Sequence, residues 1–213
     1  MSRPAPNLND ATPEEHFLAA IANPWRRELL VYCVTPRSQR EVFREFVCAG
    51  KKQRYTGLQG LVQNGWLHGY SDVHRLEVYR LNPIGPILLS QLIGVTFGQG
   101  WDRIDDDGMP SAVSEYEACD AAIAALRRGS CRRIVSMLSG GPVHIKELRE
   151  FAGVAPRDFN VSCTILKTAH TIREDGRFVS LTGAGLPGLE GWLNRISVIP
   201  ERSAGAQASE VAA

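Results

Sequence analysis

NPWRRELL, at residues 23–30, aligns with GSCRRIVS, at residues 129–136. Further along, RLNPIG at residues 80–85 aligns with SLTGAG at residues 180–185, so two short matches occur in the same order. The offset is 106 residues in the first match and 100 in the second, which makes the second copy six residues shorter in between. We therefore interpret the chain as a duplication, with copies over 24–92 and 130–193.

Each copy has the same expected order of elements: three helices, a β-hairpin and a closing helix. Apolar residues at helical spacing, N-cap residues such as Ser38 and terminators such as Gly65 set the boundaries. In the first copy we expect helices at 24–34, 39–47, 52–64 and 84–92, with strands at 66–68 and 77–81. In the second we expect helices at 132–138, 144–151 and 156–168, then strands at 171–173 and 177–181 around an Asp-Gly turn signal. The predicted fold class is mainly α with small β-hairpins (α+β).

An acidic connector separates the two copies. Residues 94–117 carry six acidic side chains and one basic one, whereas the blocks 1–93 and 118–213 each have a net charge of +3. Glycine, proline and a run of Asp make this region unsuitable for the interior of a helix or strand. We predict an N-terminal domain over 1–97, an acidic linker over 98–113, a C-terminal domain over 114–200 and a flexible tail over 201–213.

The composition limits the classes of function. The 213 residues have a net charge of +1, and 44% are apolar, which is enough for a core. The longest apolar stretch, Ile84–Phe97, is too short to span a membrane, and no secretory signal is visible. The five cysteines form no C-x-x-C pair, which argues against disulfides or a zinc site and favours the cytoplasm. Phosphate-loop, zinc-protease and serine-hydrolase motifs are absent, so we expect neither an enzyme nor a metal or cofactor.

Three helices followed by a hairpin is the element order of the winged helix-turn-helix. Over 20–92 and 127–193 the chain resembles bacterial winged-helix transcription regulators of the ArsR, MarR and HxlR type. Those families open with an Asn/Asp-Pro-x-Arg-Arg helix, as at 23–27, and lead from the wing through a Tyr-x-Leu-Thr-x-x-Gly stretch, as at 79–85. The resemblance implies a tandem winged helix-turn-helix that binds double-stranded DNA. Two features depart from it: Gly57 and Gly60 weaken the expected recognition helix by about 1 kcal/mol each, and the metal-sensing cysteine pair is missing.

A basic segment of the first copy fits a DNA-binding role. Residues 37–54 carry six basic and two acidic side chains, a local charge of +4. Lys neutralises phosphates, whereas Arg and Gln pair with guanine and adenine edges in the major groove. We expect the basic residues of one set to neutralise phosphates: Arg37, Lys51, Lys52 and Arg54. We expect a second set to contact base edges: Gln53, Tyr55, Gln59 and Gln63. Arg40 is a further DNA-binding candidate.

The second copy is less basic, and two roles stay open for it: DNA contact or dimerisation. Its candidate residues are Arg157, Asn160, Thr164 and Lys167, and the two hairpins add Arg75 and Arg177 near the minor groove or the backbone. The densest basic cluster, Arg127, Arg128, Arg132 and Arg133, either contacts phosphates, pairs with the acidic connector, or caps helix ends.

The sequence thus predicts a sequence-specific, double-stranded DNA-binding transcription regulator, with a homodimer as a possible assembly. Because it carries two units, one chain could read two half-sites about one helical turn apart. Two alternatives remain. One is a protein-interaction scaffold, like the partners of kleisin subunits, with 84–97 and 118–126 as partner surfaces; the other is a plasmid-type replication initiator.

Overall fold

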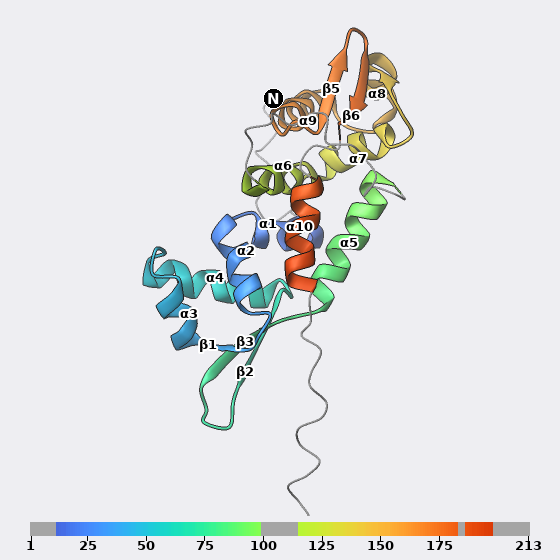
Figure 1. The fold of residues 1–213 in the computed structure, drawn as a ribbon. Helices are drawn as coiled ribbons and strands as arrows, with labels where there is room; N and C mark the ends of the chain where they lie inside the picture. Colours follow the sequence, from blue (N-terminus) through green and yellow to red (C-terminus); the bar gives the residue numbers. More distant parts are fainter. Residues whose placement is uncertain (1–11, 99–114, 183–185, 198–213) are drawn as a thin grey trace, which may run out of the picture.

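The structure, a computed structural model, describes residues 12–98, 115–182 and 186–197. Figure 1 shows an elongated molecule in which helices predominate and a small antiparallel sheet lies toward each end. The N-terminal segment, most of the acidic connector and the tail lie outside the described residues, and so do the predictions made for them.

The two halves have the same order of helices and strands. The first half contains α1 (Pro13–Ile21), α2 (Pro24–Tyr32), β1 (Arg37–Ser38), α3 (Gln39–Glu45), α4 (Lys51–Gln63), β2 (Leu67–Ser71), β3 (Glu77–Leu81) and α5 (Ile84–Phe97). The second contains α6 (Glu115–Arg127), α7 (Gly129–Leu138), β4 (Val143–His144), α8 (Ile145–Phe151), α9 (Pro156–Thr168), β5 (Ile172–Asp175), β6 (Phe178–Leu181) and α10 (Leu186–Ser197). The strand orders match as well, β1-β3-β2 and β4-β6-β5.

The repeat includes one helix more than the sequence matches indicated, because α1 and α6 also correspond. Arg26 donates from Nη1 to the carbonyl of Ala20 (3.4 Å), and Arg132 donates from Nη1 to the carbonyl of Leu126 (2.7 Å). Each arginine therefore reaches back six residues to the C-terminal end of the preceding helix, where carbonyl groups have no partner within the helix. For Arg132, helix-end capping is the alternative that the structure supports.

Local signals explain most element boundaries. Ser38 and Glu41 form a capping box at the start of α3, in which the Glu41 amide donates to Ser38 Oγ (3.3 Å) and the Ser38 amide donates to Glu41 Oε2 (2.7 Å). Gly65 follows α4 with φ +75°, which is the left-handed conformation expected of a terminator. The closing helix α5 runs to Phe97, beyond its expected end at residue 92.

One hydrophobic core runs through both halves. The ring of Trp66 stacks on Phe17 (centroids 4.3 Å apart) and contacts Trp192 of α10 (6.0 Å). The indole Nε1 of Trp192 donates to the carbonyl of Arg27 (3.4 Å). Because α10 packs on α2 and α5, the last described helix of the chain completes the core of the first half.

Helix α6 lies between the two halves and packs on α1, α7, α9 and α10 (Figure 1). Its apolar residues Ala122, Ile123, Ala125 and Leu126 are all buried inside the chain. The expectation that 118–126 offers a surface to a partner is therefore wrong, since this surface is already covered by the chain's own helices.

Candidate nucleic-acid interface

Helix α4 is held in place by a large aromatic ring that rests on its backbone. Leu58 and Leu61 face the core, and between them and the helix start Gly57 lies against the indole of Trp25. A Cβ atom at Gly57 would overlap the Trp25 ring. Gly57 lowers the helix propensity of α4, but because it has no side chain it permits the contact that fixes α4 to α2.

The second half has a contact at the corresponding place, but between two small residues. Ser162 of α9 occupies the position of Gly57, and Cys131 of α7 occupies the position of Trp25. Ser162 Oγ donates to Ser130 Oγ (2.7 Å), and Cys131 Sγ lies 4.0 Å from the Ser162 carbonyl. A small residue on one helix thus meets a large one in the first half, whereas two small residues meet in the second.

The outer face of α4 is polar and carries positive charge without any negative charge. Lys51, Lys52, Gln53 and Tyr55 are exposed, and Gln59 is half-buried at the edge of this face. No Asp or Glu occurs in α4. We call these five residues the α4 face.

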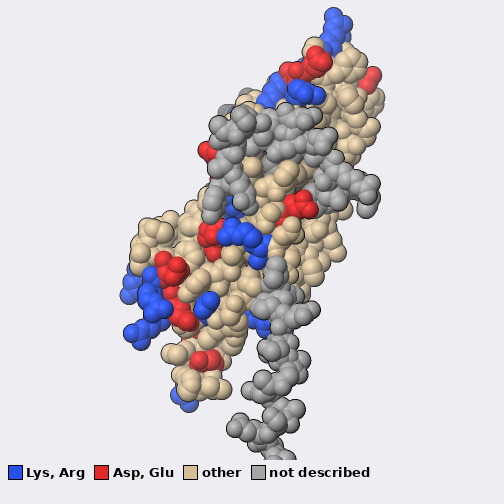
Figure 2. Space-filling view, in the orientation of Figure 1, with Lys and Arg blue, Asp and Glu red and all other residues tan. Residues whose placement is uncertain are grey.

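The N-terminus of α4 adds a further attraction for anions. Gly50 is the N-cap and supplies no side chain to the amide groups of the first turn. Helix amides at this end carry partial positive charge, and Lys51 and Lys52 lie beside them. Figure 2 shows Lys and Arg gathered at the end of the molecule where α3 and α4 meet, with acidic side chains beside them.

Two of the arginines assigned to phosphates face the protein instead. Arg54 donates from Nη1 to the Phe43 carbonyl, and its guanidinium lies 5.1 Å from the Phe43 ring centroid. Arg37 stacks on Tyr32 at 4.6 Å and donates to the Tyr32 carbonyl (3.4 Å). Arg54 therefore joins α4 to α3, and Arg37 joins β1 to α2. Arg40, on the outer side of α3, remains exposed as expected.

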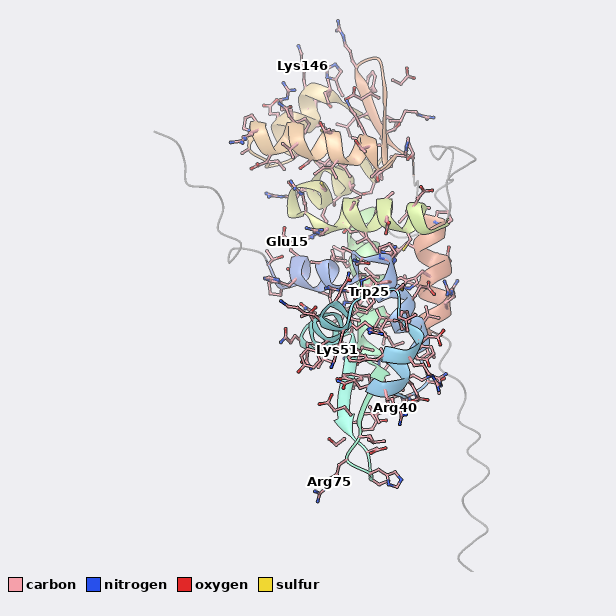
Figure 3. All side chains as sticks on the ribbon, turned by 90° about the vertical axis from the view of Figure 1, so that its left-hand side faces the viewer. Glu15, Trp25, Arg40, Lys51, Arg75 and Lys146 are labelled. Carbon is pink, nitrogen blue, oxygen red and sulfur yellow. The ribbon has the colours of Figure 1, made fainter. Side chains whose placement is uncertain are left out.

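The hairpin β2–β3 extends away from the body and carries Arg75 at its tip (Figure 3). Asp72 Oδ1 accepts hydrogen bonds from the amides of His74 (2.9 Å) and Leu76 (2.8 Å), which shapes the turn. Arg75 has φ 59° and an exposed side chain. The structure thus places Arg75 at the tip of a projecting hairpin.

A groove of about 240 Å³ separates α4 from the hairpin, and a carboxylate lies in it. Glu77 Oε2 accepts from Gln39 Nε2 (2.7 Å) and from the Tyr79 hydroxyl (3.0 Å), while Gln59 lines the opposite side. Burial raises the pKa of Tyr79 to about 12, and its hydroxyl is the donor in the bond to Glu77. Glu77 and Gln39 were missed by the sequence reasoning, because nothing in the sequence pairs residue 39 with residue 77.

The corresponding face of the second half is less cationic. Arg157, Asn160 and Thr164 are exposed on α9, but Asp158 lies in the first turn between them. Lys167 Nζ forms an ion pair with Glu174 Oε1 (2.5 Å), which compensates its charge. Arg177 is exposed on the second hairpin.

The two halves point their hairpins toward opposite ends of the molecule (Figure 1). Arg40, Lys51 and Arg75 lie in one half, and Lys146 of α8 lies near the far end (Figure 3). Of the two reading helices that the sequence suggested, α4 is the one whose exposed cations have no acidic residue on the same helix.

Comparison of the chain with protein-family models, with curated proteins and with solved structures gave no match. None of the described helices is long and apolar enough to cross a membrane. Within the described ranges, no group of three or more His, Cys, Asp or Glu side chains is arranged to hold a metal ion. The α4 face and the adjoining hairpin are therefore the features on which a functional proposal rests.

Proposed function

We propose that the chain is a sequence-specific, double-stranded DNA-binding transcription regulator built from two winged-helix units, with α4 as its main reading helix. The observation that carries this proposal is the α4 face: two lysines, two glutamines and a tyrosine on one exposed helix that has no acidic residue. A helix of this kind, preceded by a short helix and followed by a hairpin, has the dimensions to enter the major groove.

The proposed roles follow from the chemistry of each side chain. Lys51, Lys52 and the free first-turn amides of α4 neutralise and orient phosphates, which contributes affinity without sequence preference. Gln53 and Gln59 pair with adenine edges, and Tyr55 packs on bases or sugars beside them. Arg40 and Arg75 contact the backbone on either side of the groove.

Glu77 gives the same surface a means of selecting bases. A carboxylate accepts hydrogen bonds from the amino group of cytosine, and it repels phosphates. Glu77 is fixed by Gln39 and Tyr79 at the edge of the α4 face, so it selects against binding modes that bring the backbone into this groove.

The main role proposed for the second winged-helix unit is to support the structure of the first. Its helices α6 and α10 complete the core beneath α2, and its own reading helix has a mixed charge. We assign DNA contact to α4 and the first hairpin, and a supporting role to the second half.

The test is binding of the full chain to a fluorescent duplex of mixed sequence, measured by anisotropy over a range of salt concentrations. Lys52→Ala is expected to weaken binding to every sequence and to reduce the salt slope by about one unit. Lys146→Ala, which removes the same charge at the far end of the molecule, is the matched control and leaves both quantities unchanged. Indifference of the wild-type chain to duplex at low salt, or equal effects of the two variants, would overturn the proposal and leave the protein-interaction alternative.

Selection of bound duplexes from a random pool then tests sequence specificity. A single recovered motif supports α4 as the reading helix, and a pool that stays random after repeated rounds contradicts sequence-specific recognition.

A further inference from the structure

The first hairpin has two faces, and one of them is turned toward α4. A Cβ atom at Gly69 of β2 would lie 3.7 Å from the Val62 side chain of α4, so Gly69 marks the face that is turned toward this helix. Neighbouring residues of a strand alternate between the two faces, which places His68 and Tyr70 on the opposite side. We call this opposite side the outer hairpin face.

Three side chains that can contact a nucleotide share the outer hairpin face. Arg80 of β3 is the direct cross-strand partner of His68, and Tyr70 lies diagonally across from Arg80. All three side chains are exposed, Tyr70 by 46%. Within the part of the chain that the structure describes, none of the three has a hydrogen-bond or ion-pair partner. The outward positions of the two strands, 68, 70, 78 and 80, include no acidic residue.

The outer hairpin face leads into a pocket where β3 joins α5. The pocket has a volume of about 390 Å³, and Arg80 is part of its lining. Pro83 and Ile87 contribute apolar walls, whereas Ser90 and Gln91 contribute a hydroxyl and an amide. A planar ring that enters this pocket is covered by the apolar walls and can form hydrogen bonds at its edge.

The start of α5 beside this pocket does not offer a site for a phosphate group. Asn82 accepts the Ile84 amide through its side chain (3.1 Å) and the Gly85 amide through its carbonyl (3.0 Å). The prolines at positions 83 and 86 have no amide hydrogen. Of the described residues that line the pocket, Arg80 is the only charged one. The interior of the pocket therefore suits an apolar, planar group, and its entrance suits an anion.

We propose that the outer hairpin face binds single-stranded nucleic acid and that the pocket between β3 and α5 takes one unpaired base. Unpaired bases stack on exposed aromatic rings and are hydrogen-bonded at their edges, and arginine adds cation–π contacts and charge. Tyr70 and His68 stack on bases, and Arg80 binds the phosphate at the pocket entrance. A base inside a duplex is stacked and paired, so it cannot enter such a pocket. This site is separate from the α4 face, and its test does not depend on duplex binding.

The anisotropy of a fluorescent single strand of about 12 nucleotides measures binding to the full chain at low salt. Tyr70→Ala is expected to weaken this binding about fivefold or more, because one base loses its stacking partner. Phe178→Ala removes an aromatic ring that is 52% exposed on the second hairpin, and as the matched control it leaves binding unchanged. A circular-dichroism melt shows that both variants fold. A wild-type chain that does not bind the single strand overturns the proposal, and so do equal losses in the two variants.

A second pair of variants tests the pocket. Ser90→Trp fills it and is expected to weaken binding of the single strand about fivefold, since the base loses its place. Val95→Trp adds the same ring to α5 outside this pocket, where the side chain is 78% exposed, and should have no effect. Equal effects of the two variants would show that the pocket takes no base.

Photo-cross-linking locates the bound strand. A single strand that contains 5-iodouracil is expected to cross-link to Tyr70, as identified by mass spectrometry of the digested complex. Cross-links confined to Tyr55 and its neighbours would place the single strand on the α4 face and overturn the proposal. Anisotropy with duplex is measured in parallel, so that a failure of the single-strand site and a failure of the proposed duplex binding are recognised separately.

Discussion

The indole of Trp25 lies directly against the backbone of α4 at Gly57, and this contact fixes the proposed reading helix on the core. Gly57→Ala adds a methyl group where the ring already lies. We expect a loss of about 1–3 kcal/mol in the free energy of unfolding, because overpacking outweighs the better helix propensity of alanine. Denaturant unfolding monitored by circular dichroism measures it.

Gly60→Ala is the control for that substitution on the same helix. The nearest atom to a Cβ at Gly60 is Arg26 Nη1 at 3.9 Å, which is ordinary contact. This variant is expected to gain up to about 1 kcal/mol. Effects of the same sign at the two positions would contradict the packing described for Trp25.

The two halves are joined by a buried arginine. Arg27 is 1% exposed, donates to the Ile21 carbonyl (2.9 Å) and forms an ion pair with Asp120 of α6. Asp120→Asn leaves a buried guanidinium without its counterion. Because Asp120 itself is partly exposed, we expect a loss of about 1–3 kcal/mol rather than the larger cost of a fully buried pair. Glu28→Gln, which breaks the exposed Arg195–Glu28 pair, is expected to cost no more than about 1 kcal/mol.

Cys48 is the one exposed cysteine of the five and lies three residues before Lys51. At pH 8 we expect one thiol per native chain to react with iodoacetamide. Burial raises the pKa of Cys33 to about 12 and raises the pKa values of Cys131 and Cys163, so these thiols stay protonated and unreactive. Bound duplex is expected to slow the labelling of Cys48. If bound duplex leaves the rate of Cys48 labelling unchanged, the DNA does not lie at the start of α4.

Stability is expected to fall in alkaline solution. A group whose pKa is raised by folding releases its proton at a lower pH in the unfolded chain than in the folded one. The unfolded state is therefore stabilised relative to the folded state as pH rises. Ionisation of Cys33 lowers the free energy of unfolding from near pH 9 to about pH 12. Ionisation of Tyr79 lowers it further from about pH 10. Each group contributes up to about 1.4 kcal/mol per pH unit within its window. Replacing Cys33 by alanine should reduce the slope of unfolding free energy against pH between 9 and 10. An unchanged slope would show that Cys33 ionises alike in both states.

Glu77→Gln is expected to separate selectivity from affinity. Loss of the carboxylate removes a repulsion toward phosphates, so binding to unselected duplex tightens, while the preference at one base pair of the selected site relaxes. Asp175→Asn on the second hairpin removes the same charge away from the α4 face and should change neither. Parallel effects of the two variants would indicate a general effect of net charge.

Much of the fold could be predicted because its signals are local. The helix at 156–168 has both ends where they were expected, since Pro156 opens it and the apolar spacing continues to its end. The N-cap at Ser38 and the turn at Gly176 of the second hairpin follow from adjacent residues. Such features need only a few neighbours along the chain.

Features that depend on distant residues were not predictable in this way. Strand β1 consists of two residues that pair with Tyr79 and Val78, and no local pattern marks it. Arg54 has the sequence context of a phosphate-binding residue, yet the position of Phe43 turns it inward. The contact between Trp66 and Trp192 joins residues from the two copies, and repeat matching gives no information on how copies pack.

The contribution of α10 to the core of the first half has a practical consequence for dissecting the molecule. A gene fragment that stops after α5 would encode a product that lacks the Trp192 ring beside Trp66 and the Asp120 carboxylate beside Arg27, and we expect it to aggregate. The function of each half is therefore best tested by point substitutions in α4 or α9 of the full-length chain.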